Sequence, residues 1–466
     1  MANKVPGTIV TYKSDTSGSL GTEQDITLLA PSLINTSGAK IRVASGEFAK
    51  TTLGEASVGY QIAKAILDES PNATLYVVPI DSSSMGTGAT AEVAVIGEKV
   101  TSAGNFTLWT GTTKVADVSV AVDDTATAVA EKIRVALTQS VDALFTIALT
   151  DATITLTTKS KGEVSNGFVI VTDVYGADKP VTGLTFTVSK FTGATGSPSL
   201  ATVFTGLEAE YMDFIVNPYT DAQSITDLVS ELDRRATPEV NMPTKAISAI
   251  FGDETTVPSE TISRTMWLAV YAFKYSIEAL MTYLGAFSAS AVEAYSSDPA
   301  ANLEGTPVST IKTMSPMGQP AQEVILGYGF CTYYANKDGV WRIQRMVSTD
   351  IEDPNNRNFK VPVVLSYLTE DLKSYVDSNN TGVKIVDPGF PVTPDSGKIT
   401  STDLLKGQLV IRLQEYYTRA LIVDIEGTLD NLEVIRPAGS ESLVANVPVT
   451  VIADAIRRTI NLIYKN

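Results

Sequence analysis

The sequence contains no histidine and only one cysteine in 466 residues. Without histidine the chain cannot build a Ser-His-Asp or Cys-His catalytic group or a His-ligated zinc site, and it lacks the commonest general base near neutral pH. The single cysteine, Cys331, excludes an internal disulfide and a cysteine-rich metal site. No basic cluster lies beside it in the sequence to lower its pKa, so we expect a buried and inert thiol.

Long apolar runs are also missing. No run reaches the roughly 20 residues that cross a bilayer, and the N-terminal stretch lacks the apolar core of a signal peptide. We therefore expect a protein that folds in a cytoplasm and does not insert into a membrane.

Positive charge is scarce relative to negative charge. The chain has 35 Lys and Arg against 52 Asp and Glu, a formal net charge of −17. A general nucleic-acid binder is expected to show a basic surface, so this charge argues against nucleic acid as a partner. Copies of such a chain repel one another unless local patches are complementary, which predicts that any assembly of them is sensitive to salt.

The polar motifs do not predict an enzyme. Gly397-Lys398 lacks the upstream glycine and the following Ser or Thr of a phosphate-binding loop. The acidic runs at 350–353 and 252–254 lack calcium-loop spacing, so solvated turns are the better interpretation. We predict no catalytic site, no cofactor and no metal.

The length predicts two to four domains of roughly 100–150 residues. The first pattern alternates between strand and helix: a strand at 41–43, a helix at 57–69 and a buried strand at 75–80. The same pattern resumes later, with helices at 200–210 and 222–235, strands at 211–216 and 245–251, and a long helix at 260–283. Together, 21–84 and 200–336 read as one discontinuous α/β domain.

Between these two parts lies a region of different composition. A Ser/Gly-rich linker at 82–88 leads into residues 85–199, which are rich in Thr, Val, Ala and Gly. Alternating runs predict strands at 106–109, 115–122, 145–149, 154–158, 168–171 and 184–188, and one apolar stripe predicts a helix at 125–137. We expect an inserted β-rich domain whose Thr-rich faces are exposed to solvent.

The stretch 337–379 predicts a turn at Asp338-Gly339, a strand in which Val340, Trp341, Ile343 and Met346 form the apolar face, a polar turn, and then a helix. Further on, 404–416 predicts a helix, and 419–426, 431–437 and 442–453 predict strands. These elements make 337–455 a C-terminal α+β domain.

Several motifs carry a family resemblance. The run D-G-V-W-R-I-Q-R-M-V-S-T at 338–349, followed by an acidic, Asn-rich turn and a helix, resembles the C-terminal domain of contractile tail sheath proteins, in particular those of Mu-like myophages. The turn at 157–166 resembles the family's T-A-x-x-K-G-E-x-G-N pattern, with Lys161, Gly162, Glu163 and Asn166 in matching places and Ser165 in place of glycine. Residues 191–200 resemble its G-G-A-x-x-P-x-L connector, 218–221 its P-Y-T-D element, and 298–301 its D-P-A-R-P turn, with Ala301 in place of arginine.

The resemblance implies a structural subunit of a contractile sheath. Such subunits form six-fold rings stacked helically around a tail tube, and they work with tube, baseplate and tail terminator proteins. The C-terminal domain would face the tube, the insertion would lie outside, and the particle would be a virion tail or a phage-tail-like particle assembled in the bacterial host cytoplasm. Contraction would drive the tube through the envelope of the target cell.

Sheath subunits also donate terminal arms to sheets of their neighbours. Residues 1–20 are expected to be such an extended arm, and residues 456–466 a last core strand, an arm, or a strand that continues into a short arm. The apolar side chains expected to make the contacts between subunits are Val5, Ile9, Val10, Tyr12, Ile460, Leu462 and Ile463.

Five arginines in or beside the C-terminal domain are candidates for contacts with acidic groups on the tube or on adjacent subunits: Arg342, Arg345, Arg436, Arg457 and Arg458. Pairing within the chain, or solvation, is the alternative for most of them. For the whole protein, the Thr-rich β segments leave an acidic surface adhesin as the alternative function. An enzyme built on the α/β domain ranks third.

Overall fold

The computed structural model describes residues 23–454 except 175, 177, 258–262, 392, 394–396 and 439. The described residues form two compact units, a larger one of residues 23–296 and 303–359 and a smaller one of residues 297–302 and 360–454. The predicted arms at 1–20 and 456–466 lie outside the described residues, and so do Arg457 and Arg458.

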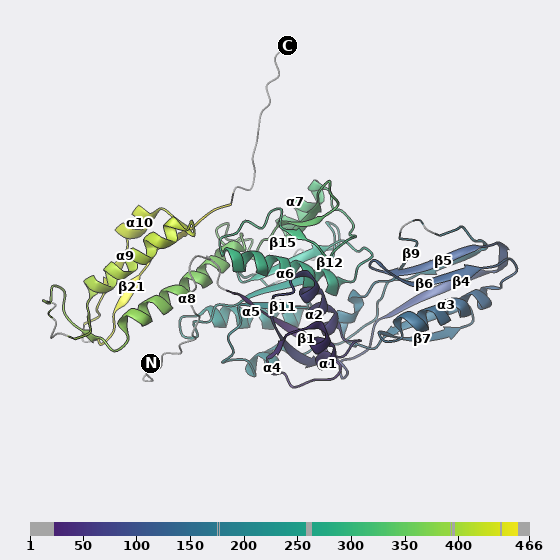
Figure 1. The fold of residues 1–466 in the computed structure, drawn as a ribbon, viewed down its shortest axis with the longest axis horizontal. Coiled ribbons are helices and arrows are strands. Elements are labelled where there is room, and N and C mark those ends of the chain that lie inside the picture. The colour runs from purple at the N-terminus through teal and green to yellow at the C-terminus, as the bar shows by residue number, and fades with distance from the viewer. Residues whose placement is uncertain are drawn as a thin grey trace, which may run out of the picture. The chain divides into compact units, whose positions relative to one another are not determined.

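A nine-stranded sheet organises the described part of the larger unit (Figure 1). Its order is β14-β16-β15-β13-β12-β11-β1-β3-β2, and the six strands from β15 to β3 are parallel. Most of these six strands are nearly continuous apolar runs, which is typical of a parallel sheet covered on both faces. The bounds are β1 (Asp25–Ser32), β2 (Ile41–Val43), β3 (Thr74–Asp81), β11 (Phe214–Asn217), β12 (Lys245–Phe251), β13 (Leu268–Phe273), β14 (Pro307–Val308), β15 (Phe330–Ala335) and β16 (Trp341–Arg345).

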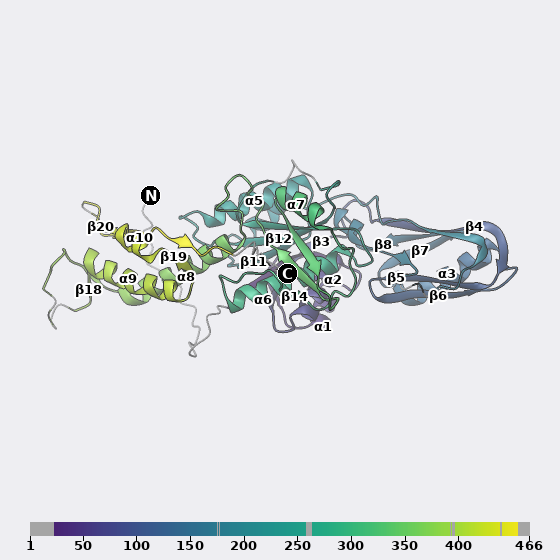
Figure 2. The same ribbon diagram turned by 90° about the horizontal axis from the view of Figure 1, so that it is seen from above.

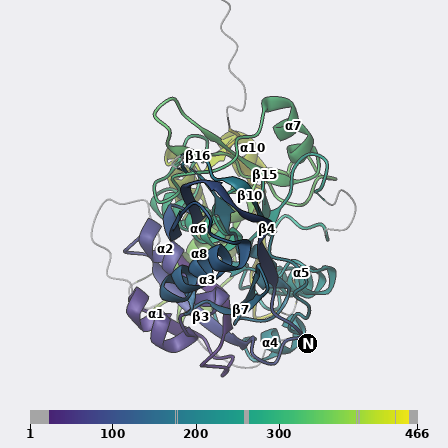
Figure 3. The same ribbon diagram turned by 90° about the vertical axis from the view of Figure 1, so that its right-hand side faces the viewer.

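Helices cover both faces of this sheet. Figures 2 and 3 show α5 on one side of the strands and α2 and α6 on the other. The bounds are α1 (Gly46–Leu53), α2 (Val58–Glu69), α4 (Leu200–Thr205), α5 (Ala222–Ala236), α6 (Leu280–Ser297) and α7 (Gln319–Gly327). Polar caps begin the two helices that the sequence predicted best: the Ser57 hydroxyl accepts the Tyr60 N–H at 3.0 Å, and Asp221 accepts the Ser224 N–H at 3.0 Å.

The predicted helix at 260–283 is wrong over residues 263–279 and right only over its last turn, 280–283. That stretch contains β13, all six residues of which are buried, and α6 begins only at Leu280. The run from Trp267 to Phe273 is apolar on every side, so its periodicity does not distinguish a buried strand from a buried helix. Its neighbours in the sheet, β12 and β15, decide the outcome.

The insertion contains two small sheets and a helix. One sheet has the order β10-β4-β8-β7 and the other β6-β5-β9, and α3 packs against β6 of one and β4 of the other. The bounds are β4 (Thr90–Ser102), β5 (Gly104–Thr110), β6 (Thr113–Val120), α3 (Ala126–Val141), β7 (Phe145–Thr150), β8 (Thr153–Thr158), a 3₁₀ turn (Glu163–Gly167), β9 (Val171–Thr172) and β10 (Thr182–Val188). The long strand β4 has no counterpart among the predicted strands.

The division of the chain differs from the predicted boundary between 336 and 337. Strand β16 follows that boundary, yet it pairs with β15 and β14 and so belongs to the nine-stranded sheet. The smaller unit takes over only at Lys360, where α8 begins.

Helices and very short strands build the smaller unit. The bounds are α8 (Lys360–Asn380), β17 (Lys384–Ile385), β18 (Ile399–Thr400), α9 (Thr402–Thr418), β19 (Ile422–Val423), α10 (Ile425–Asp430), β20 (Glu433–Ile435), β21 (Val444–Asn446) and β22 (Thr450–Val451). Its core consists mainly of apolar side chains from α8 and α9: Val364, Tyr367, Leu368, Leu405, Leu409, Leu413, Tyr416, Leu421, Ile422 and Leu432.

Candidate functional site

The polar motifs considered as possible catalytic or metal sites serve local structure. Asp350 accepts the Asn356 amide at 3.0 Å and the Asp353 N–H at 3.3 Å, which closes a turn. Asp253 accepts the hydroxyls of Thr255 and Thr256, and these hydrogen bonds lower its pKa to about 2. In the residues that the structure describes, no group of three potential metal ligands comes together, and no helix is both long and apolar enough to cross a membrane.

The thiol of Cys331 is fully buried, and burial raises its pKa to about 12. Its sulfur lies 3.3 Å from both the backbone N–H and the backbone carbonyl of Val347. The expected burial of Cys331 is confirmed.

A cluster of charged side chains lies at the amino ends of the parallel strands, the side of the sheet where ligands are least expected. Asp25 begins β1, Asp213 precedes β11, and Lys245 begins β12, so all three lie at the amino ends of parallel strands. Asp25 and Asp213 accept each other's backbone N–H at 2.9 and 2.8 Å, and Lys40 pairs with Asp25 at 2.9 Å. Burial lowers the pKa of Lys245. Open α/β sheets bind ligands at the carboxyl ends of their strands, so this cluster is interpreted as structural.

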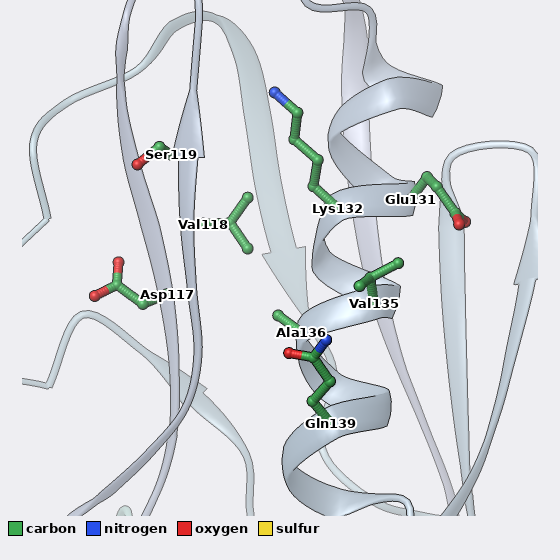
Figure 4. A pocket seen from close by; sticks show the side chains of 8 residues that line it. All are labelled: Asp117, Val118, Ser119, Glu131, Lys132, Val135, Ala136 and Gln139. Atoms are coloured by element: carbon green, nitrogen blue, oxygen red, sulfur yellow. The ribbon is translucent and has the colours of Figure 1, made fainter.

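A pocket of about 370 Å³ lies between β6 and α3 of the insertion (Figure 4). Val118 points from the strand toward the helix, and the charged residues around the pocket already have partners. Lys132 pairs with Asp124 at 2.6 Å, Glu131 with Arg134 at 2.6 Å, and Asp117 with Lys114. The pocket therefore lacks the convergent polar groups of a substrate site.

The structure does not bring the candidate arginines together. Arg342 and Arg345 lie on β16 in the larger unit, whereas Arg436 lies in the smaller one. Arg342 donates to the Gly305 carbonyl at 2.9 Å and to Asp338 at 3.0 Å. Arg436 donates to the Ser440 carbonyl at 3.0 Å and lies 3.5 Å from Asp387. Arg345 is half-buried. Arg342 and Arg436 thus already have partners within the chain.

An ion pair that the sequence did not reveal joins the two long helices of the smaller unit. Arg412 on α9 contacts both carboxylate oxygens of Asp371 on α8, with Nε to Oδ2 at 2.6 Å. Tyr416 also donates to Asp371, whose hydrogen bonds raise the pKa of Arg412. Asp371 and Arg412 are 41 positions apart in the chain, so no local spacing could have indicated this contact.

The same unit has open sheet edges. Among the described strands, β20 pairs only with β21, and β19 only with β22. Two-stranded sheets are marginally stable alone, and their unpaired backbone groups can accept another strand. The cross-strand pair Ile435 and Val444 leaves apolar side chains 42% and 41% exposed.

Helix α9 also has an exposed apolar stripe on the side away from its core contacts. Leu404 and Ile411 are 41% and 56% exposed, and Gly407 lies between them on the same face of the helix. The open edges of the small sheets and this stripe are the candidate assembly surface of the smaller unit. The last described residue of this unit is Asp454, shortly after β22.

Comparison with known proteins shows that the chain is similar to a tail sheath protein. No protein-family model matches the chain. It is 24% identical over 414 residues to the Mu-like prophage FluMu tail sheath protein of Haemophilus influenzae, covering 86% of this chain and 84% of that protein. A sheath tail protein from Listeria innocua aligns at 12% identity with a TM-score of 0.49 over 94% of each chain. The contracted helical sheath of the anti-feeding prophage aligns at 10% identity with a TM-score of 0.47, over 100% of this chain and 99% of that one.

The similarity to the Haemophilus influenzae protein thus covers the larger part of both chains, as the order of the motifs predicted. The resemblance of this chain to the tail sheath proteins of Mu-like phages is confirmed.

Proposed function

We propose that this chain is a subunit of a contractile tail sheath, which assembles as stacked six-membered rings around a tail tube and contracts to drive the tube through a target envelope. The observation that carries the proposal is the similarity to a tail sheath protein over 86% of the chain. The role is structural, and the partners are further copies of the chain, the tube, the baseplate and the tail terminator. Assembly takes place in the bacterial host cytoplasm, and the product is part of a virion tail or phage-tail-like particle.

The smaller unit supports this proposal because its sheets are incomplete. A strand donated by a neighbouring subunit would pair with the open edge of β20-β21 or of β19-β22 and satisfy a row of backbone groups. The donors are the arms, through Val5, Ile9, Val10 and Tyr12 in one and Ile460, Leu462 and Ile463 in the other. An extended arm of 20 residues reaches about 70 Å, at about 3.5 Å per residue, far enough to reach an adjacent subunit.

Charge favours the same arrangement. The smaller unit contains fourteen Asp and Glu against eight Lys and Arg, whereas residues 455–466 carry Arg457, Arg458 and Lys465 and no acidic residue. A basic segment from one subunit is attracted to the acidic unit of the next, although the whole chains repel each other. This attraction weakens as salt rises, since the Debye length falls to about 3 Å at 1 M ionic strength.

The proposed contraction needs contacts of two strengths. Backbone ladders between an arm and its acceptor sheet survive the change of state, while weaker contacts at the rim of each subunit break and re-form. The extended lattice is then a kinetically trapped state, and a baseplate trigger lets subunits move outward and bury more mutual surface.

Electron microscopy of the purified chain, without tube or baseplate and across a salt series, tests this proposal. A sheath subunit is expected to form hollow striated cylinders of regular width, and their number should change with salt. If the chain stays monomeric at every salt concentration and does not bind an added tail tube, the proposal is contradicted and the adhesin alternative is favoured.

A further inference from the structure

The insertion contacts the body of the larger unit at the segment between β13 and α6. The backbone N–H of Gly111, in the turn between β5 and β6, donates to the Ile277 carbonyl at 2.8 Å. The ammonium of Lys190, just after β10, lies 4.0 Å from the centre of the Tyr275 ring. This segment, residues 274–279, is called the platform below.

One acidic side chain of the platform lies directly beneath the β5-β6 turn. A Cβ atom placed on Gly111 would overlap both carboxylate oxygens of Glu278, so the glycine allows the backbone to approach the acid. Gly111 also has φ +58°, a conformation that favours glycine. The turn and the carboxylate are therefore in van der Waals contact.

The Glu278 carboxylate is not compensated by its surroundings. Glu278 is half-buried, and within the described part of the chain it takes part in no ion pair. The loss of part of its hydration raises its pKa to about 7. Titratable and charged groups near Glu278 on the neighbouring elements include Lys114 and Asp117 on β6, Lys190 after β10, Lys274 and Tyr275 on the platform, and Tyr283 on α6. Lys114 pairs with Asp117, and Lys190 lies over Tyr275. Tyr283 donates to the Thr313 carbonyl at 3.2 Å, and its pKa is raised mainly by burial.

We propose that Glu278 is a proton-sensitive latch: in its neutral form it lets the β5-β6 turn rest on the platform, and in its ionised form it releases the turn. An ionised carboxylate pressed against a backbone turn loses part of its water without gaining a partner. Release exposes the carboxylate to water and leaves the insertion attached through its linkers. The latch is a property of the single chain and does not depend on the proposed sheath assembly.

The sign of the pH effect follows from the direction of the pKa shift. Below about pH 4.5 the acid is neutral in both the docked and the released state, so docking is strongest there. Between about pH 4.5 and 7 the released state loses its proton first, so docking weakens as pH rises. Above about pH 7 both states are ionised and the weakening stops. Each pH unit in that window raises the equilibrium constant for release of the turn by up to about tenfold. Over the whole window this constant should rise roughly ten- to a hundredfold.

Hydrogen exchange of the full chain, followed by mass spectrometry on peptides covering 104–113, tests the latch. After correction for intrinsic exchange rates, protection of the Gly111 region should fall roughly ten- to a hundredfold between pH 5 and pH 8. Glu278→Gln, which cannot ionise, should keep the turn protected at both pH values. Gly111→Ala should weaken the protection at both, because φ +58° disfavours alanine and the new methyl group would displace the carboxylate from the turn.

A matched control is Glu98→Gln, which removes the same charge from an exposed position of the insertion and should behave like the unaltered chain. If Glu278→Gln shows the pH dependence of the unaltered chain, or if the unaltered chain shows none, the proposal is wrong. Should Glu278→Gln fail to fold, ¹³C NMR of the unaltered chain decides: a Glu278 carboxyl that titrates near pH 7 supports the latch, and one near pH 4.5 contradicts it.

Discussion

The two units of the described chain differ in how complete they are. In the larger unit, helices cover both faces of a nine-stranded sheet. Large aromatic side chains such as Tyr271, Phe273 and Phe287 are fully buried and in mutual contact. The smaller unit has a core made mainly by two helices, and its described strands form only pairs of two or three residues each.

This difference suggests a division of labour. Both units expose some large apolar side chains, among them Ile34, Ile96 and Val122 in the larger one. The smaller unit, which is much shorter, still leaves Leu404, Ile411, Ile435 and Val444 more than 40% exposed. A unit with exposed apolar side chains and open strand edges gains stability from partners. In the proposed sheath, the larger unit would move as one body while the smaller unit keeps the lattice connected.

The largest expected effect is loss of the aromatic core in the larger unit. Phe287→Ala should lower the free energy of unfolding of that unit by about 3–5 kcal/mol, because Phe287 is fully buried against three other aromatic rings. Denaturant unfolding measures it. Phe390→Ala in the smaller unit, where Phe390 is 47% exposed, should change stability by less than about 0.5 kcal/mol. Equal losses would remove the contrast between the units.

A matched glycine pair compares the packing of the two units with one substitution. Gly285→Ala on α6 should destabilise by about 1–3 kcal/mol, since its Cβ would lie 2.7 Å from the Ala65 Cβ and from the Ile62 carbonyl oxygen. Gly407→Ala on α9 meets nothing within 4 Å and should stabilise its helix by up to about 1 kcal/mol. Thermal unfolding of both variants gives the two signs, and a destabilised Gly407→Ala would show that the exposed stripe of α9 is covered.

The contact between α8 and α9 should depend on the shape of one side chain. Arg412→Lys keeps the charge but loses the bidentate hydrogen bonds to Asp371. The free energy of unfolding of the smaller unit should therefore fall by about 1–2 kcal/mol. Hydrogen exchange along α8 and α9 should quicken in this variant, while exchange in β11, β12 and β13 stays the same. Faster exchange throughout the chain would mean that the two units unfold together.

The smallest effect on stability, and a large one on assembly, is expected at the C-terminal basic residues. Replacing Arg457 and Arg458 together by Glu should leave unfolding of the isolated chain unchanged. It should reduce the yield of cylinders, because the segment would then repel the acidic unit of a neighbour. Replacing Lys99 and Lys132, two exposed residues of the insertion, together by Glu tests whether any lost positive charge has the same effect. Unchanged assembly and unchanged tube binding after the double reversal would remove these two arginines from the interface.

Much of the fold could be predicted from local pattern, and the reason is physical. Helices α2 and α5 carry clear apolar stripes and polar caps, and most insertion strands alternate with period two, so each element shows its own signal. The buried run of β13 has no polar face, and its conformation is set by neighbouring strands far away in the sequence. The predicted helix failed there for that reason.

The candidate site was less predictable. The motif order did predict the resemblance to sheath proteins, which the comparison confirmed. The carbonyls that accept from Arg342 and Arg436, the contact of Arg412 with Asp371, and the open edges of β20-β21 all depend on tertiary structure. The roles proposed for the arms remain predictions, because their residues lie outside the described part of the chain.

The most direct test of the central claim is a cryo-electron microscopy map of the assembled cylinders at a resolution that traces the backbone. We predict that a strand from another subunit lies along the edge of β20-β21 or of β19-β22, in every subunit of the lattice. Cylinders in which both edges face solvent, or are covered only by the same subunit, would contradict the claim that the smaller unit is completed by its neighbours.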